Sequence, residues 1–181
     1  MLDDIRQLLG PAFEELAGAR LGGEIPISER VVNRFIADRL RASDGAVESA
    51  EVQLRANDEL AVRVRLRRPR FAPTVIVALR IEQQPDLAAA PVLVLRWWLP
   101  GMGALAALAR PALGFLKTTP PGVTLDGDRI TLDVPRLLRE RGAGEVLDYL
   151  AALRINTRDR VLLIGFELRV KEPYCPAPVS N

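Results

Sequence analysis

Strict alternation of apolar and polar residues constrains this chain more than any other feature. Residues 50–55 read Ala-Glu-Val-Gln-Leu-Arg, and from residue 60 onward Leu, Val, Val and Leu alternate with arginines at 63, 65 and 67. Successive side chains of a β-strand point to opposite faces, so each segment predicts a strand with one apolar face. Asn57-Asp58 between them predicts a tight hairpin turn.

The rest of the chain adds strands and turns of the same kind. Residues 71–81 place apolar side chains on one face, whereas Val92 to Trp98 is apolar on both. Val123 to Val134 predicts a short hairpin that turns at Asp126-Gly127-Asp128, and residues 152–156 with 161–170 predict a closing hairpin. The fold class expected is therefore α+β, with a long antiparallel sheet.

Three segments carry helical periodicity. Residues 2–17 repeat Leu, Ile and Phe at three- and four-residue steps and predict an amphipathic helix that packs on the domain or on another subunit. The alternative is a helix that lies on a membrane surface. Ser28 predicts the start of a second helix, and Gly22-Gly23 is interpreted as the end of the preceding section. Pro135 predicts a third helix, broken at Gly142-Ala143-Gly144.

Residues 97–116 form the most hydrophobic stretch of the chain and reach the length of a membrane span. Pro100-Gly101, Arg110 and Pro111 interrupt this stretch. Proline disrupts the interior of a helix, and the amphipathic strands on both sides are typical of a water-soluble fold. A strand end followed by a short buried helix is therefore favoured over a span.

Residue types that are missing exclude several kinds of chemistry. The 181 residues include no histidine, and Cys175 is the only cysteine. Ser-His-Asp and Cys-His catalysis, intrachain disulfides and the usual zinc sites are therefore excluded. Asp126-Gly127-Asp128 lacks the further ligands of a calcium loop and favours a plain turn. We expect a protein that is not an enzyme and has no cofactor and no metal.

Arginines form a basic row along one predicted strand. Arg63, Arg65 and Arg67 occupy alternate positions and therefore share a face. This face is interpreted as solvated, or as a site for the phosphate of a lipid head group. Nucleic acid is the least favoured partner, because no aromatic residues interleave with the arginines to stack on bases.

The order of these elements resembles that of bacterial TULIP-like lipid-binding proteins, of the mycobacterial phospholipid-binding family type. The similar stretches are residues 27–33 (Ile-Ser-Glu-Arg-Val-Val-Asn), residues 123–134 and residues 153–170. The resemblance implies a long curved antiparallel sheet wrapped on a helix, with an apolar groove that takes acyl chains, here preceded by the extra N-terminal helix.

The function expected is non-catalytic binding of a lipid or another apolar ligand in that groove, with peripheral membrane contact as an option. Arg63, Arg65 and Arg67 are the expected head-group residues. The expected groove residues are Val31, Phe35, Ile36, Val92, Val94, Trp97, Trp98, Leu105, Leu108, Leu113, Phe115 and Leu116.

The alternative is an assembly module that packs its apolar face and N-terminal helix against a partner chain, as in a homo-oligomer. The expected organisation is an N-terminal helix in residues 1–23, one domain in residues 24–171 and a Pro-rich tail in residues 172–181. The acidic start of the sequence, Met-Leu-Asp-Asp, does not look like a secretory signal, so the expected location is cytoplasmic or at the inner membrane surface.

Overall fold

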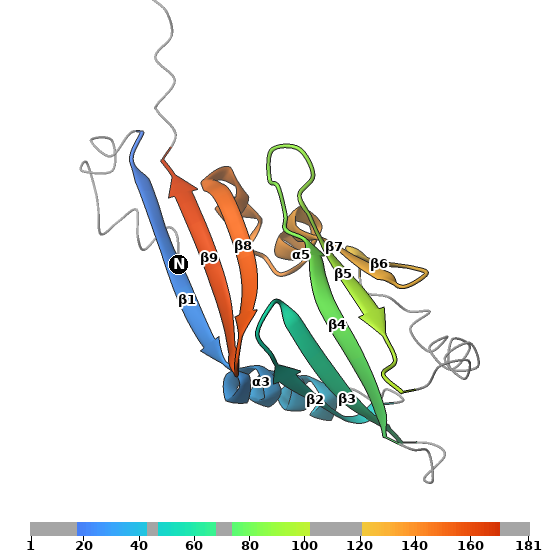
Figure 1. The fold of residues 1–181 in the computed structure, drawn as a ribbon. Helices are drawn as coiled ribbons and strands as arrows, with labels where there is room; N and C mark the ends of the chain where they lie inside the picture. Colours follow the sequence, from blue (N-terminus) through green and yellow to red (C-terminus); the bar gives the residue numbers. More distant parts are fainter. Residues whose placement is uncertain (1–17, 43–46, 68–73, 102–120, 171–181) are drawn as a thin grey trace, which may run out of the picture.

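The computed structural model describes residues 18–42, 47–67, 74–101 and 121–170 (Figure 1). These residues form an α+β fold in which all strand pairs are antiparallel, as the alternation predicted. The strands divide between two sheets, where the sequence predicted one long sheet. The helix predicted in residues 2–17 and the Pro-rich tail from residue 172 lie outside the described residues.

The larger sheet has six strands and follows the chain from hairpin to hairpin. Asn57 and Asp58 both have positive φ angles, of 62° and 61°, which is the geometry of the predicted tight turn. Gly127 provides the corresponding positive φ in the second predicted hairpin. In spatial order the strands are β2 (Val47–Leu54), β3 (Glu59–Leu66), β4 (Val75–Gln83), β5 (Val92–Trp98), β7 (Arg129–Asp133) and β6 (Val123–Asp126).

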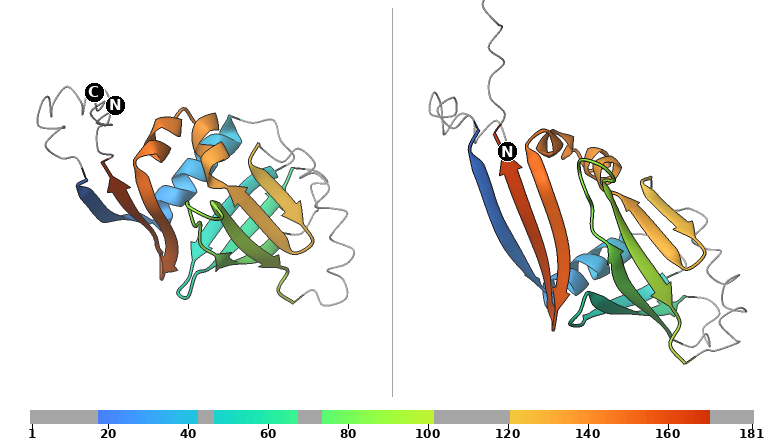
Figure 2. Two further views of the ribbon diagram at one scale, coloured as in Figure 1. Left: turned by 90° about the horizontal axis from the view of Figure 1, so that it is seen from above. Right: turned by 45° about the horizontal axis from the view of Figure 1, so that its top comes forward.

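The smaller sheet has three strands, in the order β1 (Arg20–Ser28), β9 (Val161–Arg169) and β8 (Leu150–Arg158). β8 and β9 form the predicted closing hairpin. β1 pairs along its whole length with β9, so Ile25 lies opposite Ile164. The two sheets converge where β8 turns into β9 and diverge toward the other end (Figures 1 and 2).

β1 was not predicted, because Gly22-Gly23 was interpreted as the end of the preceding section. Gly23 lies opposite Phe166, and a Cβ atom at residue 23 would stand only 3.3 Å from the aromatic ring. The glycine therefore leaves room for the ring to lie against β1. Since β1 begins at Arg20, this strand crosses the predicted boundary between residues 23 and 24.

Helix α3 (Glu29–Arg41) follows β1 directly and closes the free edge of β2. Asn33 binds both backbone groups of one edge residue: Oδ1 accepts from Val52 N at 2.7 Å, and Nδ2 donates to Val52 O at 2.8 Å. Glu29 Oε2 accepts from Leu54 N at 2.7 Å. These are groups that β2 would otherwise offer to another strand, so the helix protects this edge from pairing.

Gln84, immediately after β4, does the same at the edge of β8 and thereby joins the two sheets. Its Oε1 accepts from Ile155 N at 2.9 Å, and its Nε2 donates to Ile155 O at 2.7 Å. A second link lies nearby, where Asp58 Oδ1 accepts from Thr157 N at 2.8 Å. The Thr157 hydroxyl donates to Glu59 O at 3.2 Å, which satisfies this buried side chain.

The turn between β8 and β9 completes the junction. Arg160 N donates to Leu54 O at 3.2 Å, and Glu29 N donates to Arg160 O at 2.9 Å. One turn residue thus binds both the end of β2 and the start of α3. The end of the molecule at which the sheets converge is held by a continuous set of directed hydrogen bonds.

The segment after β7 matches its prediction closely. Asp133 caps α5 (Val134–Glu140) by accepting from Arg136 N at 2.9 Å, with Pro135 in the first turn. The predicted glycine-rich break separates α5 from the 3₁₀ helix η3 (Gly144–Asp148). Val134 at the start of α5 is buried, so this segment contributes to the core.

We expect Asn33→Asp to destabilise the protein by about 1–3 kcal/mol, because a carboxylate oxygen would replace the amide that donates to Val52 O. Urea denaturation measures the change. Arg34→Gln, at the exposed neighbouring position, changes the net charge by the same amount and serves as the control. Equal losses in the two variants would show that the Asn33 contacts contribute nothing specific.

We expect Gln84→Met to raise the hydrogen-exchange rate of the Ile155 amide about fivefold, for the loss of a hydrogen bond worth about 1 kcal/mol. The methionine keeps the length of the side chain but removes the amide. Gln83→Met, at the exposed residue beside it, is the control. An unchanged Ile155 rate in Gln84→Met contradicts the role given to Gln84.

Candidate functional site

One face of the six-stranded sheet is apolar at every described position. Leu60 lies opposite Leu79, Leu79 lies opposite Trp97, and Leu95 lies opposite Ile130, so the apolar residues of neighbouring strands are in register. We call this surface the apolar face. It comprises Ala50, Val52, Leu54, Leu60, Val62, Val64, Leu66, Val75, Val77, Leu79, Ile81, Leu93, Leu95, Trp97, Val123, Leu125, Ile130 and Leu132.

The apolar face is only partly covered by the residues that the structure describes. Leu79, Trp97 and Leu99 form a buried cluster at its centre. The residues packed around this cluster are only partly buried, and none of the large described side chains is completely buried. The partly buried neighbours of the cluster are Leu60, Val62, Val75, Val77, Leu95 and Ile130.

Trp97 carries the one polar atom that the structure leaves buried and unpaired among the described side chains. Only 8% of the residue is exposed, and its Nε1 has no hydrogen-bond partner. A buried donor without an acceptor costs about 1–3 kcal/mol. This N–H group is therefore a buried donor on the apolar face that lacks a hydrogen-bond acceptor.

The expected groove residues of β5 divide between the two faces of the sheet. Trp97 lies on the apolar face, opposite Leu79, whereas Trp98 lies on the other face, opposite Ala78. Val92 and Val94 share the face of Trp98, because they are an even number of residues away from it. The structure therefore does not bring Val92, Val94 and Trp98 together with Trp97.

The expected groove residues of α3 are more exposed than an internal stripe would be. Val31 is 55% exposed and Phe35 is 52% exposed, while Ile36 is partly buried. The side of the helix that carries Glu29 and Asn33 is turned to the edge of β2, so the opposite side, which carries Val31 and Phe35, is left open. Arg39 stacks on Phe35, 5.2 Å from the ring centroid.

Five further expected groove residues lie in a segment that the structure does not describe. They are Leu105, Leu108, Leu113, Phe115 and Leu116, within residues 102–120. Their expected role stays a prediction.

The expected head-group arginines lie on the polar face of the sheet, away from the apolar face. Arg63 lies opposite Glu51 and forms an ion pair with it at 3.7 Å, and Arg65 pairs with Glu48 at 3.8 Å. Arg67 follows directly after β3 and is exposed. Sequence reasoning identified the row of arginines but not the acidic residues beside it, because the pairing register of β2 and β3 decides which charges meet.

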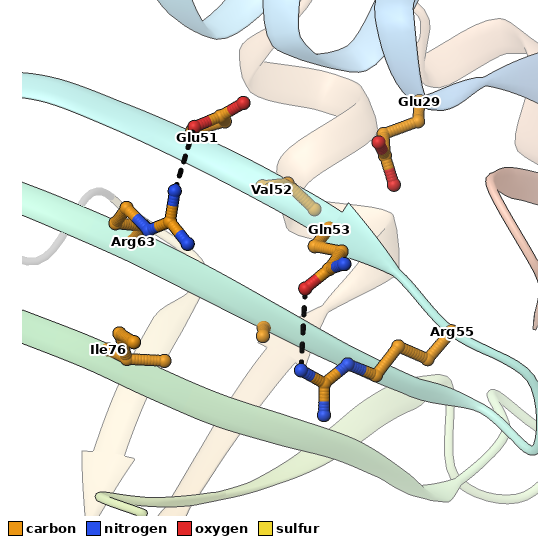
Figure 3. A pocket seen from close by; sticks show the side chains of 8 residues that line it. Glu29, Glu51, Val52, Gln53, Arg55, Arg63 and Ile76 are labelled. Carbon is orange, nitrogen blue, oxygen red and sulfur yellow. Dashed lines mark hydrogen bonds and ion pairs between the residues drawn. The ribbon is translucent and has the colours of Figure 1, made fainter.

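A pocket of about 190 Å³ lies on this polar face, beside the start of α3. Figure 3 shows the side chains that line it. The Glu51–Arg63 ion pair lies at one end, and Arg55 donates to Gln53 Oε1 at 3.3 Å at the other. Glu29, at the rim, already accepts from Leu54 N. The charged side chains of the pocket are thus engaged with each other or with β2, as in a structural junction.

Farther along the polar face, charges of three neighbouring strands form a network. Arg96 pairs with Asp128 at 2.8 Å and with Glu82 at 3.6 Å, and Glu82 also pairs with Arg129 at 3.0 Å. All these side chains are at least partly exposed, so solvent screens their attraction. The network makes this face strongly polar and contrasts it with the apolar face behind it.

A second pocket lies where the chain enters β1 and leaves β9, lined by residues 18, 147–151, 169 and 170. Tyr149 O accepts from Arg169 N in this region, and Gly18 N donates to Val170 O. The pocket thus borders backbone pairing at the end of the small sheet.

Within the described ranges there is no group of three or more acidic or cysteine side chains placed to hold a metal ion. No helix among those residues is long and apolar enough to cross a membrane. The chain matches no protein-family model, and neither a curated protein nor a solved structure matches it significantly.

For the basic row, we expect the Glu51–Arg63 ion pair to contribute less than about 1 kcal/mol to stability, because both side chains are more than half exposed. A double-mutant cycle with Glu51→Ala and Arg63→Ala, measured by urea denaturation, gives the coupling energy. The corresponding cycle for Glu48 and Arg65 is the matched comparison. A coupling well above that value at either pair contradicts this view of the polar face.

Proposed function

We propose that the protein binds a lipid or another apolar ligand against the apolar face of the six-stranded sheet, without carrying out chemistry on it. The observation that carries the proposal is the apolar face itself. It is apolar on every strand, yet the side chains that surround its central cluster are only partly buried.

Burial of apolar surface supplies the driving force for such binding. Each CH₂ group removed from water contributes about 0.8 kcal/mol, so an acyl chain laid over several strands gains affinity without directed contacts. The face offers aliphatic side chains such as Val62, Val77 and Leu95, which impose little polar selectivity. Val31 and Phe35 of α3 provide further exposed apolar surface.

A TULIP-like architecture stays an expectation. The row of arginines lies outside the proposed site. Arg63 and Arg65 project from the polar face, and successive residues of a strand point to opposite faces, so these arginines do not reach a ligand that lies on the apolar face. An acyl chain on the apolar face is therefore not held by these arginines. A head group, if the ligand has one, meets other parts of the molecule.

A second candidate function, assembly with another chain, is favoured by β1. This strand forms one edge of the smaller sheet, and no described strand pairs with its other side. Leu21 is 64% exposed and Ile25 is 50% exposed on it. An unpaired strand with exposed apolar side chains is a site at which a further strand can add.

The first test of the proposal is native mass spectrometry of freshly purified protein, followed by organic extraction and lipid analysis. Co-purified lipid supports the proposal. Protein that is free of lipid, fails to bind acyl probes and forms a stable oligomer favours the assembly function instead.

We expect Val77→Thr to weaken binding of a fluorescent acyl probe about 5- to 30-fold, because a hydroxyl buried against the acyl chain costs about 1–2 kcal/mol. Threonine retains the shape and the strand preference of valine. Ile76→Thr, at the next residue of β4, changes the polar face and is the control. Equal affinities of both variants and the unmodified protein would place the probe elsewhere.

A further inference from the structure

β1 is the most exposed strand of the small sheet, and no described strand pairs with its outer edge. Every residue of β1 except Ile27 is exposed. Figures 1 and 2 show β1 as the outermost strand of this sheet. The backbone groups on its outer edge are therefore accessible to another chain, and the pairing with β9 identifies which residues carry them.

The hydrogen bonds to β9 show which residues of β1 direct their backbone groups outward. Ala19 O accepts from Val170 N, and Glu29 N donates to Arg160 O, so the odd-numbered residues of β1 pair with β9. The register of β1 against β9 has no shift. Successive residues of an antiparallel strand direct their N–H and C=O groups to opposite edges, so the even-numbered residues face outward. They include Arg20, Gly22 and Glu24.

This outward row of backbone groups stops at both ends. Pro26 is the next even-numbered residue and has no N–H group to donate. At the other end, Gly18 N already donates to Val170 O at 3.0 Å. Gly22 lies midway between these two stops, so the outward pattern is symmetric about it. A strand that pairs with a second copy of itself around a two-fold axis requires this symmetry.

The side chains have the same symmetry in their charges. In an antiparallel pair centred on Gly22, Arg20 of each copy lies directly opposite Glu24 of the other, where opposite charges attract. The Arg20 side chain is 66% exposed even though it forms an ion pair with Glu167 at 3.6 Å. Glu24 is exposed and forms no ion pair with a described residue. A pair centred on Glu24 would instead oppose like charges and place Pro26 opposite Gly22.

We propose that a second copy of this chain pairs its β1 antiparallel with β1, in the register centred on Gly22. The two small sheets then become one continuous sheet across the two-fold axis. Leu21 of one copy becomes the diagonal neighbour of Ile25 of the other, so side chains that are 64% and 50% exposed in one copy become covered. This inference rests on the assembly function proposed for β1 and is independent of ligand binding at the apolar face.

The test uses two charge variants that repel themselves and attract each other. Arg20→Glu places two acidic residues opposite each other, and Glu24→Arg places two basic residues there. We expect each variant alone to dimerise about tenfold more weakly than the unmodified protein in sedimentation equilibrium. In an equimolar mixture, native mass spectrometry should show the heterodimer in large excess over both homodimers. Glu140→Arg, at an exposed position of α5, is the control and should dimerise like the unmodified protein.

Hydrogen exchange of the unmodified protein tests the register without any variant. The amides of Gly22 and Glu24 point to the open edge and become hydrogen-bonded only in the dimer, so their exchange should slow as the protein concentration rises. The amides of Gly23 and Ile25 already point to β9, so their exchange should change much less.

The outcomes separate this pairing from the assembly function on which it rests. A protein that stays monomeric at every concentration, with unchanged Gly22 and Glu24 exchange, overturns both. A dimer in which the two charge variants behave like Glu140→Arg leaves assembly standing but overturns the pairing of β1 with β1. Slow Gly22 exchange in a monomer at every concentration would show that another segment of the same chain occupies the edge, which also overturns the pairing.

Discussion

The architecture depends on side-chain amides that take the place of a neighbouring strand. A primary amide carries a carbonyl acceptor and an N–H donor, the same two groups that a peptide unit offers across a sheet. Asn33 presents this pair to Val52 on the edge of β2, and Gln84 presents it to Ile155 on the edge of β8. At each of these edges, a side-chain amide therefore occupies the place where the backbone of a further strand would otherwise pair. The first contact fixes α3 beside the large sheet, and the second fixes the two sheets to each other.

The hydrogen bonds between the two sheets lie at one end of the molecule. They do not cover the apolar face. Directed hydrogen bonds hold the end where the sheets converge, around Thr157 and Arg160. Hydrophobic burial around Leu79, Trp97 and Leu99 remains incomplete within the described part of the chain. A molecule that binds there stabilises the folded state by mass action, in proportion to the logarithm of its concentration. The ligand binding that we propose would thus be coupled to stability through the same surface.

The sequence predicted the strands and turns whose formation depends on residues close together in the chain. Alternation located β2, β3, β4 and the β8–β9 hairpin, and a short run that is apolar on both faces located β5. The turn residues Asn57-Asp58 and Asp126-Gly127-Asp128 lie where they were expected. The expectation of one sheet in place of two was wrong, because sheet membership depends on pairing between distant strands. β1 was missed for the same reason: Gly23 has a structural role only beside Phe166, far along the chain.

The candidate site shows the same limit. Alternation alone placed Trp97 and Trp98 on opposite faces, as observed, but it did not say which face would be apolar across all six strands. Grouping Val92, Val94 and Trp98 with Trp97 ignored that parity. Likewise, the arginine row was visible in the sequence, whereas its neutralisation by Glu48 and Glu51 required the register of β2 against β3.

The pairing of β1 with β9 also has a consequence for biosynthesis. Ile25 meets Ile164, about 140 residues later, so β1 has no strand partner until almost all of the described chain has been made. At about 5–20 residues per second, the ribosome needs roughly 7–30 s to synthesise that distance. The large sheet forms from local hairpins and can assemble during this time. Until β9 emerges, both edges of β1 stay unpaired and open to chaperones or to other chains, whereas in the folded protein one of these edges is paired with β9.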